Sequence, residues 1–207
     1  MSDLLYYMFN KPKGCITARK DMVHKTVMDY FEEELREEIF PVGRLDKDTT
    51  GLLLFTNDGQ FDQYLMHPKH HVKKTYYFWV YGEINKEKLD ALREGVNIGR
   101  GEEIISKPCE IEIIRYGKYS EFSDIMRREE CEEVGHNSLL QMVGNGCITI
   151  SEGKKHQVKR MFRAIGCYVV MLRRVAIGEV ELDCKLQEGE YRKLTEEERE
   201  RLYRDEV

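Results

Sequence analysis

The chain has 207 residues, which is enough for one large or two small domains with a real hydrophobic core. Apolar residues make up 41% and charged residues 34% of the sequence, a balance typical of globular proteins, and no run approaches the about 18 apolar residues that indicate a membrane span. The six cysteines lie at least sixteen residues apart, which excludes a C-x-x-C metal or redox pair and favours reduced thiols in the cytoplasm. The first residues, MSDLLYYMFN, contain no basic leader, so we expect no secretory signal.

The net charge of −5 hides an uneven distribution of charges. Three segments contain several lysines or arginines and no acid, namely residues 10–20, 67–79 and 153–174. If these segments lie on one face, that face attracts a polyanion such as RNA, while acidic segments cover the rest. The alternative is that each charged run is ordinary solvated surface.

The first half of the chain alternates short strands and helices. Residues 6–14 read as a strand that ends in a Pro-Gly turn, and residues 24–35 as a helix with a capping box at Thr26 and Asp29. A polar turn then leads into the strand 51–55, and residues 60–66 read as a helix. Residues 73–82 alternate as a strand that places Lys74, Tyr76, Phe78 and Val80 on one face.

The second half mixes the same kinds of element. Gly95 ends a predicted helix at 85–96, a strand follows at 110–116, and residues 116–138 read as a charged, irregular insertion. The remaining elements are predicted as strands at 146–153, 167–182 and 188–194 and helices at 154–165 and 195–202. No regular strand-helix-strand alternation occurs, so we predict an α+β fold with a mixed, largely antiparallel sheet.

The helix predicted at 154–165 is strongly two-sided. Its apolar stripe consists of Val158, Met161, Phe162 and Ile165. On the other side, basic residues recur every fourth position, at Lys155, Lys159 and Arg163, and therefore form one line along the helix.

The segment GRLDKDTTGLLLFTN, residues 43–57, places two aspartates directly before a hydrophobic strand, where burying a charge is costly. Asp46 and Asp48 start a partial calcium-loop pattern, but its twelfth position is Asn57 instead of a bidentate glutamate. A D-x-D magnesium site lacks a glycine-rich phosphate loop nearby. A purely structural turn suits Asp48 as a cap but leaves Arg44 without a role.

Four segments together resemble a known family. They are FNKPKG at 9–14, GRLDKDTTGLLLFTNDG at 43–59, KKTYYFWVYG at 73–82, and ISEGKKHQVKRMFRAIG at 150–166 followed by LRRVAIG. Their sequence and order resemble the pseudouridine synthases that act on ribosomal RNA and include the small-subunit uridine enzymes. The resemblance implies one catalytic domain, residues 1–207, whose bent sheet and flanking helices form two subdomains with a central catalytic cleft.

The resemblance also implies the roles of individual residues. Asp46 is expected to be the catalytic carboxylate, Tyr76 to stack on the target base, and Lys159 to pair with the aspartate. Arg44 is expected to fill the gap that an extruded nucleotide leaves in the RNA. Independently of the resemblance, the basic segments predict further RNA contacts from Lys11, Lys13, Lys74, Lys155, His156, Gln157, Arg160 and Arg173. The alternatives are that Tyr76 is an ordinary core aromatic, that Lys159 is a solvated helix lysine, and that His156 and Gln157 simply support the helix.

The chemistry of the isomerisation agrees with a single carboxylate. Converting uridine to pseudouridine breaks a C–N glycosidic bond, turns the uracil and forms a C–C bond at the same sugar carbon, without consuming water. A glycosidase needs two carboxylates, whereas an isomerase that retains its base can use one. Asp46 could act on the sugar carbon, on the uracil ring or on a sugar proton, and the sequence leaves these three open.

The pattern of the family differs here at the N-terminus, where many relatives carry an RNA-binding module of roughly sixty residues before the KPKG strand, so we expect no such separate module. The expected protein needs no cofactor and no metal, binds RNA but no membrane, and is a cytoplasmic monomer. Two other hypotheses remain at this point: a non-catalytic RNA-binding module that assists ribosome assembly, and a metal-dependent sugar-transfer enzyme that uses Asp46 and Asp48.

Overall fold

The computed structural model describes residues 3–132 and 141–203, which divide into two compact units. The first unit combines Met1–Lys74 with Arg173–Val207, and the second is Thr75–Leu172. Two strands, β4 (Lys74–Tyr81) and β7 (Tyr168–Ile177), have residues in both units. The second unit is therefore inserted, in sequence, between two parts of the first.

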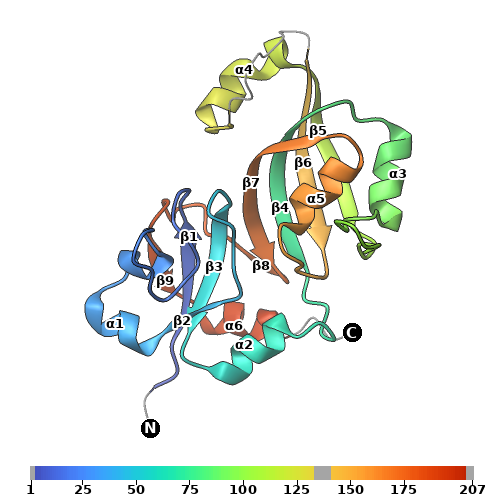
Figure 1. The fold of residues 1–207 in the computed structure, drawn as a ribbon. Coiled ribbons are helices and arrows are strands. Elements are labelled where there is room, and N and C mark those ends of the chain that lie inside the picture. The colour runs from blue at the N-terminus through green and yellow to red at the C-terminus, as the bar shows by residue number, and fades with distance from the viewer. Residues whose placement is uncertain (1–2, 133–140, 204–207) are drawn as a thin grey trace. The chain divides into compact units, whose positions relative to one another are not determined.

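In the first unit the strand order is β7-β3-β1-β9, with β2 added to β3 and β8 added to β7 (Figure 1). Apart from β7, these strands are β1 (Tyr6–Lys11), β2 (Phe40–Val42), β3 (Thr50–Thr56), β8 (Val180–Glu181) and β9 (Tyr191–Lys193). Its helices are η1 (Val27–Tyr30), α1 (Glu33–Glu38), α2 (Gly59–Met66) and α6 (Glu196–Leu202). The pairing of β3 with β7 is parallel, whereas β1 pairs with β3 and β9 antiparallel.

Strand β3 is buried on both faces, which explains its unbroken hydrophobic sequence. Leu52 and Leu54 pack in one cluster with Phe61 of α2 and Leu202 of α6. The alternate residue Phe55 contacts the aromatic ring of Phe31, 4.5 Å away. Because successive side chains of a strand point to opposite faces, the core of this unit fills both sides of β3.

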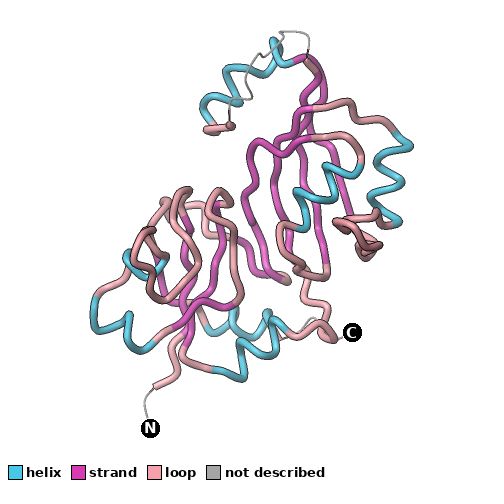
Figure 2. The backbone as a smooth tube through the Cα atoms, in the orientation of Figure 1, coloured by secondary structure: helices cyan, strands magenta, loops and turns pink. Residues whose placement is uncertain are grey.

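In the second unit the strand order is β5-β6-β4-β7, with β5 (Glu110–Lys118) antiparallel to β6 (Met142–Ile150). Its helices are α3 (Lys86–Glu94), α4 (Tyr119–Arg128) and α5 (Gln157–Ala164), drawn in cyan in Figure 2. Phe78 of β4 contacts Phe162 of α5, with ring centroids 4.6 Å apart, while its neighbour Trp79 packs with Met126 of α4. Helices α5 and α4 therefore cover opposite faces of β4.

The α+β class and the largely antiparallel sheet are confirmed, but three local predictions were wrong. The helix predicted at 24–35 is two short helices, η1 and α1, with an extended residue Phe31 after η1. The helix predicted from 154 begins at Gln157, so Lys155 precedes it. The segment predicted to be irregular from 116 contains the end of β5 and helix α4, and positions 133–138 of it lie outside the described residues.

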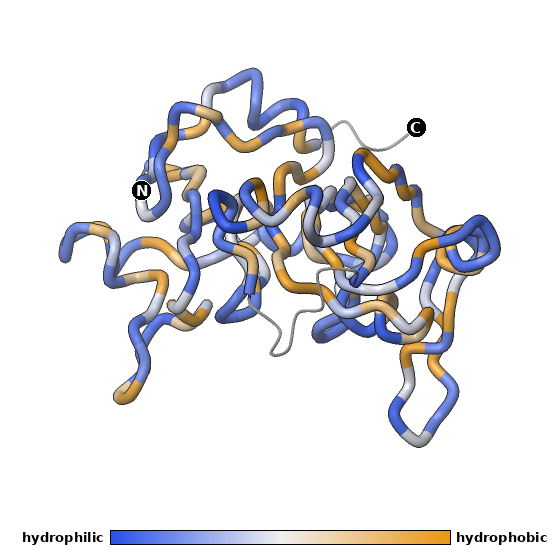
Figure 3. Tube along the Cα trace, turned by 90° about the horizontal axis from the view of Figure 1, so that it is seen from above, coloured by the Kyte–Doolittle hydropathy of each residue, from blue (hydrophilic) through white to orange (hydrophobic). Residues whose placement is uncertain are grey.

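Hydrophobic and hydrophilic residues alternate in short stretches along the traced chain (Figure 3). Within the described ranges, every helix is too short or too polar to cross a bilayer.

Candidate active site

The loop from Gly43 to Thr49 joins β2 to β3 in the first unit and carries Asp46. Gly43 adopts φ +67°, a conformation that favours glycine. The hydroxyl of Thr17 donates to the carbonyl of Leu45 at 2.9 Å and accepts from its N–H at 3.1 Å, and the Thr49 N–H donates to the Asp46 carbonyl at 3.1 Å. The loop is therefore held by its backbone, with a half-buried carboxylate at Asp46 and exposed side chains at Arg44 and Asp48.

The side chain of Lys11 binds the backbone of this loop. Its side chain is fully buried, and its Nζ donates to the carbonyls of Pro12 at 3.0 Å and Thr49 at 2.9 Å. Burial lowers the pKa of Lys11, while the nearby carboxylates of Asp48 and Asp46 oppose that shift. The ammonium of Lys11 therefore holds the backbone of the loop that carries Asp46 and adds positive charge near it. Its RNA contact stays a prediction, which this burial does not support.

The start of β3 is fixed by β7. Gly51 pairs with Arg174, and a Cβ built on Gly51, where φ is +97°, would lie 2.2 Å from the Arg174 carbonyl. The buried Arg174 donates from Nε to the Leu52 carbonyl at 2.7 Å. Its neighbour Arg173 is half-buried and pairs with Thr50. The RNA contact predicted for Arg173 stays a prediction.

Lys74 lies at the first position of β4 and is buried, although it was predicted to contact RNA. Its Nζ donates to the Val72 carbonyl at 3.1 Å. Burial, with a smaller contribution from the charge of Arg174, lowers the pKa of Lys74 to about 8. The RNA contact of Lys74 stays a prediction, which this burial does not support because a phosphate needs an accessible ammonium.

The other two predicted catalytic residues belong to the second unit. Tyr76 follows on β4 with only 8% of its surface exposed, on the strand face that also carries Phe78. Lys159 is half-buried on α5, beside the buried residues Val158 and Phe162. The packing of Phe78 on Phe162 thus joins the strand of Tyr76 to the helix of Lys159.

The turn before α5 is organised by Gln157 and Glu152. The Gln157 side chain is buried, accepts from the Lys154 N–H at 2.9 Å and donates to Glu152 Oε1 at 2.6 Å. Glu152 also accepts from the Lys107 N–H at 2.8 Å and binds the Lys154 ammonium at 2.6 Å, and these bonds hold the pKa of its carboxyl below the usual value. Gln157 therefore supports the start of α5, and its RNA contact stays a prediction.

The remaining basic candidates are more accessible. Lys13, Lys155 and His156 are exposed, and His156 adopts the left-handed conformation with φ +53°. Arg160 is half-buried, and its guanidinium donates to the carbonyls of Ile98 and Lys155. For these four residues RNA binding stays a prediction.

Two positioning residues escaped the sequence analysis. Thr17 looked like any polar residue of a basic segment, and Glu152 stood just outside one. The only available signal for Lys11 was its place in a strand whose neighbours are all buried. Among the residues that the structure describes, no three His, Cys, Asp or Glu side chains gather as a metal-binding group.

A family model described as RNA pseudouridylate synthase matches residues 5–164, which carry the Asp46 loop, β4 and α5. The chain belongs to this family. It is an RNA pseudouridine synthase, so it isomerises uridine to pseudouridine in RNA, and the predicted enzyme class is confirmed over the non-catalytic alternative.

Named relatives are similar over nearly the whole chain. The "uncharacterized RNA pseudouridine synthase YtzG" of Bacillus subtilis is 42% identical over 95% of this chain and 72% of its own length. The "ribosomal small subunit pseudouridine synthase A" of Haemophilus influenzae is 39% identical over 95% of this chain and 73% of its own length. A crystal structure of a pseudouridylate synthase matches with a TM-score of 0.80 and 38% identity over 98% of this chain and 75% of that one.

Proposed function

We propose that this enzyme modifies uridines of ribosomal RNA and that Asp46 is its catalytic carboxylate. The observation that carries the proposal is the loop between β2 and β3, which Lys11 and Thr17 hold by its backbone and which ends in a buried strand. Such a loop keeps one half-buried carboxylate in place while the substrate changes position. The name of the Haemophilus influenzae relative supports ribosomal RNA as the substrate class.

One carboxylate suffices for the reaction because all atoms of the nucleotide stay in the product. The N1–C1′ bond breaks, a C5–C1′ bond forms, and the proton on C5 leaves while N1 gains one. No water attacks the sugar, so the second carboxylate of a glycosidase has no task. Asp46 contacts the reacting nucleotide, and attack on the sugar carbon, action on the ring and removal of a sugar proton all remain compatible with its place in the loop.

The partner residues follow from what an extruded nucleotide requires. The planar guanidinium of the exposed Arg44 suits the gap that the nucleotide leaves in the RNA. Tyr76 offers a flat ring to the target base. The pairing of Lys159 with the aspartate stays an expectation from the resemblance. Lys13, Lys155 and His156, together with Arg160 and Arg173, bind the RNA backbone.

Release of tritium from ribosomal RNA labelled with 5-³H-uridine tests the role of Asp46, because isomerisation displaces the C5 hydrogen and binding alone does not. Asp46→Asn should reduce release to background while RNA binding, measured by filter retention, persists. Asp48→Asn, an exposed change in the same loop, is the matched control and should retain activity. Tritium release by Asp46→Asn at the wild-type rate would overturn the assignment.

The remaining parts of the proposal concern the setting of the reaction. We propose that the enzyme works in the cytoplasm as a monomer, without a cofactor, and that a chelator leaves its activity unchanged. Residues 1–207 act as one catalytic domain of two subdomains, in which 116–138 is an insertion. The central cleft predicted from the resemblance stays a prediction.

A further inference from the structure

The loop between β1 and η1 exposes two hydrophobic side chains. Met22 and Val23 have relative exposures of 103% and 84%, the highest among the large hydrophobic residues of the described ranges. They are neighbours in sequence, so together they form an apolar tip. Full exposure of two adjacent apolar side chains indicates a surface that is covered in use.

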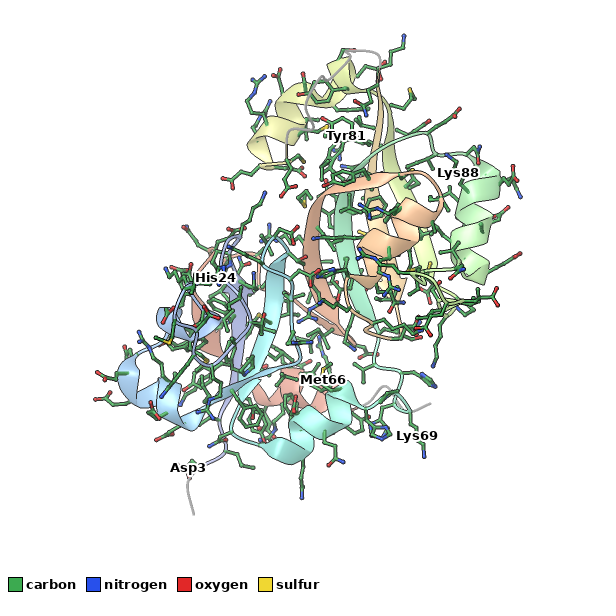
Figure 4. All side chains as sticks on the ribbon, in the orientation of Figure 1. Asp3, His24, Met66, Lys69, Tyr81 and Lys88 are labelled. Atoms are coloured by element: carbon green, nitrogen blue, oxygen red, sulfur yellow. The ribbon has the colours of Figure 1, made fainter. Side chains whose placement is uncertain are left out.

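The tip is a built structure. The carboxylate of Asp21 accepts from the N–H groups of Val23 at 2.8 Å and His24 at 2.7 Å, and it lies 3.2 Å from Nδ1 of His24, which is labelled in Figure 4. These bonds fold the backbone around Asp21. In this turn the side chains of Met22 and Val23 are exposed.

The base of the same loop is joined to the loop that carries Asp46. The Ile16 N–H donates to the Lys25 carbonyl at 2.9 Å, and the Val27 N–H donates to the Ile16 carbonyl at 2.9 Å. The next residue, Thr17, holds the backbone of Leu45, one residue before Asp46. The apolar tip and the catalytic carboxylate thus belong to one connected part of the first unit.

The charges around the tip favour a polyanion. The tip is flanked by Arg19, Lys20, His24 and Lys25, and its one acid, Asp21, is engaged in the turn. Contacts within the unit hold the cations at the base: the side chain of Lys20 lies 4.0 Å from Glu37, and Nζ of Lys25 lies 3.8 Å from the Tyr30 ring centroid. Insertion of apolar side chains between base steps is one way in which proteins unstack bases.

We propose that Met22 and Val23 form an apolar wedge that enters the base stack of folded RNA beside the target uridine, while Arg19, Lys20 and Lys25 meet the adjacent phosphates. The proposal rests on the proposed function, since it concerns the same substrate. Unstacking a base costs energy, and the cost is larger in a folded RNA than in an unpaired strand. The wedge offsets this cost, so it matters only when the target is stacked.

Two substrates of the same sequence around the target uridine separate a wedge from a general RNA contact: a folded ribosomal RNA fragment and a short unpaired oligonucleotide. The double variant Met22→Ser, Val23→Ser should lose about tenfold or more in kcat/KM on the folded fragment and stay within about twofold of wild type on the oligonucleotide. Leu4→Ser, which changes another exposed hydrophobic residue of the first unit, is the control and should match wild type on both.

A binding measurement makes the test independent of turnover. With 2-aminopurine beside the target uridine, binding of Asp46→Asn should raise the fluorescence of the folded fragment, and the same protein with the double change should not. Equal losses of kcat/KM on both substrates, no loss on either, or an unchanged rise in fluorescence with the double variant would each overturn the wedge. If wild type releases no tritium from either substrate, the proposed function fails, whereas the fluorescence result still decides on the wedge.

Discussion

Replacing Lys74 with methionine should remove a pH dependence from the stability of the protein. Lys74 is buried beside the buried Arg174, and its pKa falls from 10.5 to about 8. Because the folded pKa lies below the unfolded one, the unfolded state binds more protons between those two values. Stability contributed by this group is therefore lowest below about pH 8 and rises as the pH increases through that window.

The size of the effect follows from the shift in pKa. About 2.5 pKa units at 1.36 kcal/mol each give roughly 3 kcal/mol of unfolding free energy between pH 8 and 10.5. Methionine fills a similar volume without a charge. The unfolding free energy of Lys74→Met therefore lacks this pH-dependent increase. Relative to the variant, wild type should gain stability with rising pH, up to about that amount.

Urea unfolding followed by circular dichroism at several pH values measures the difference between the two proteins. Titration of tyrosines and cysteines occurs in both proteins and cancels in the difference. Lys69→Met, at an exposed lysine of the same basic segment, is the control and should give a flat difference from wild type. A difference between wild type and Lys74→Met that stays constant across the window would refute the reasoning.

Two further changes test packing. Gly51→Ala should lower the unfolding free energy by about 2 to 4 kcal/mol, because the new Cβ meets the Arg174 carbonyl and φ is positive at this position. Gly59→Ala is the control, because no atom lies within 4 Å of its Cβ, and calorimetry should find it nearly neutral. Glu129→Gln weakens the 2.7 Å hydrogen bond that Nε1 of Trp79 donates, and it should lower the unfolding free energy by about 1 to 3 kcal/mol. The fluorescence emission of this sole tryptophan should shift, and unchanged emission would contradict the bond.

Periodicity predicted most strands and helices correctly because their apolar residues face one core. It failed at residues 24–35, where the apolar spacing suits one helix but Phe31 turns into an aromatic cluster with Phe55 and Tyr191, at 4.5 and 4.3 Å. Packing of that ring outweighs local helix propensity and leaves Phe31 extended. Long-range contacts of this kind cannot be read from spacing.

The candidate site shows the same limit. Sequence resemblance marked Asp46, and the loop that holds it agrees with a catalytic carboxylate. Charge, however, says nothing about burial, so the sequence predicts RNA contacts for Lys11 and Lys74 although the structure buries both side chains. The bond of Gln157 to Glu152 could not be predicted, because Glu152 lies five residues away across a turn that no periodicity describes.

The loop that carries Asp46 is attached through its main-chain atoms, by the ammonium of Lys11 and the hydroxyl of Thr17. A substitution at position 44, 46, 47 or 48 leaves those attachments intact. Within these seven consecutive residues, the exposed side chains can therefore change in evolution without loss of the bonds that hold the loop.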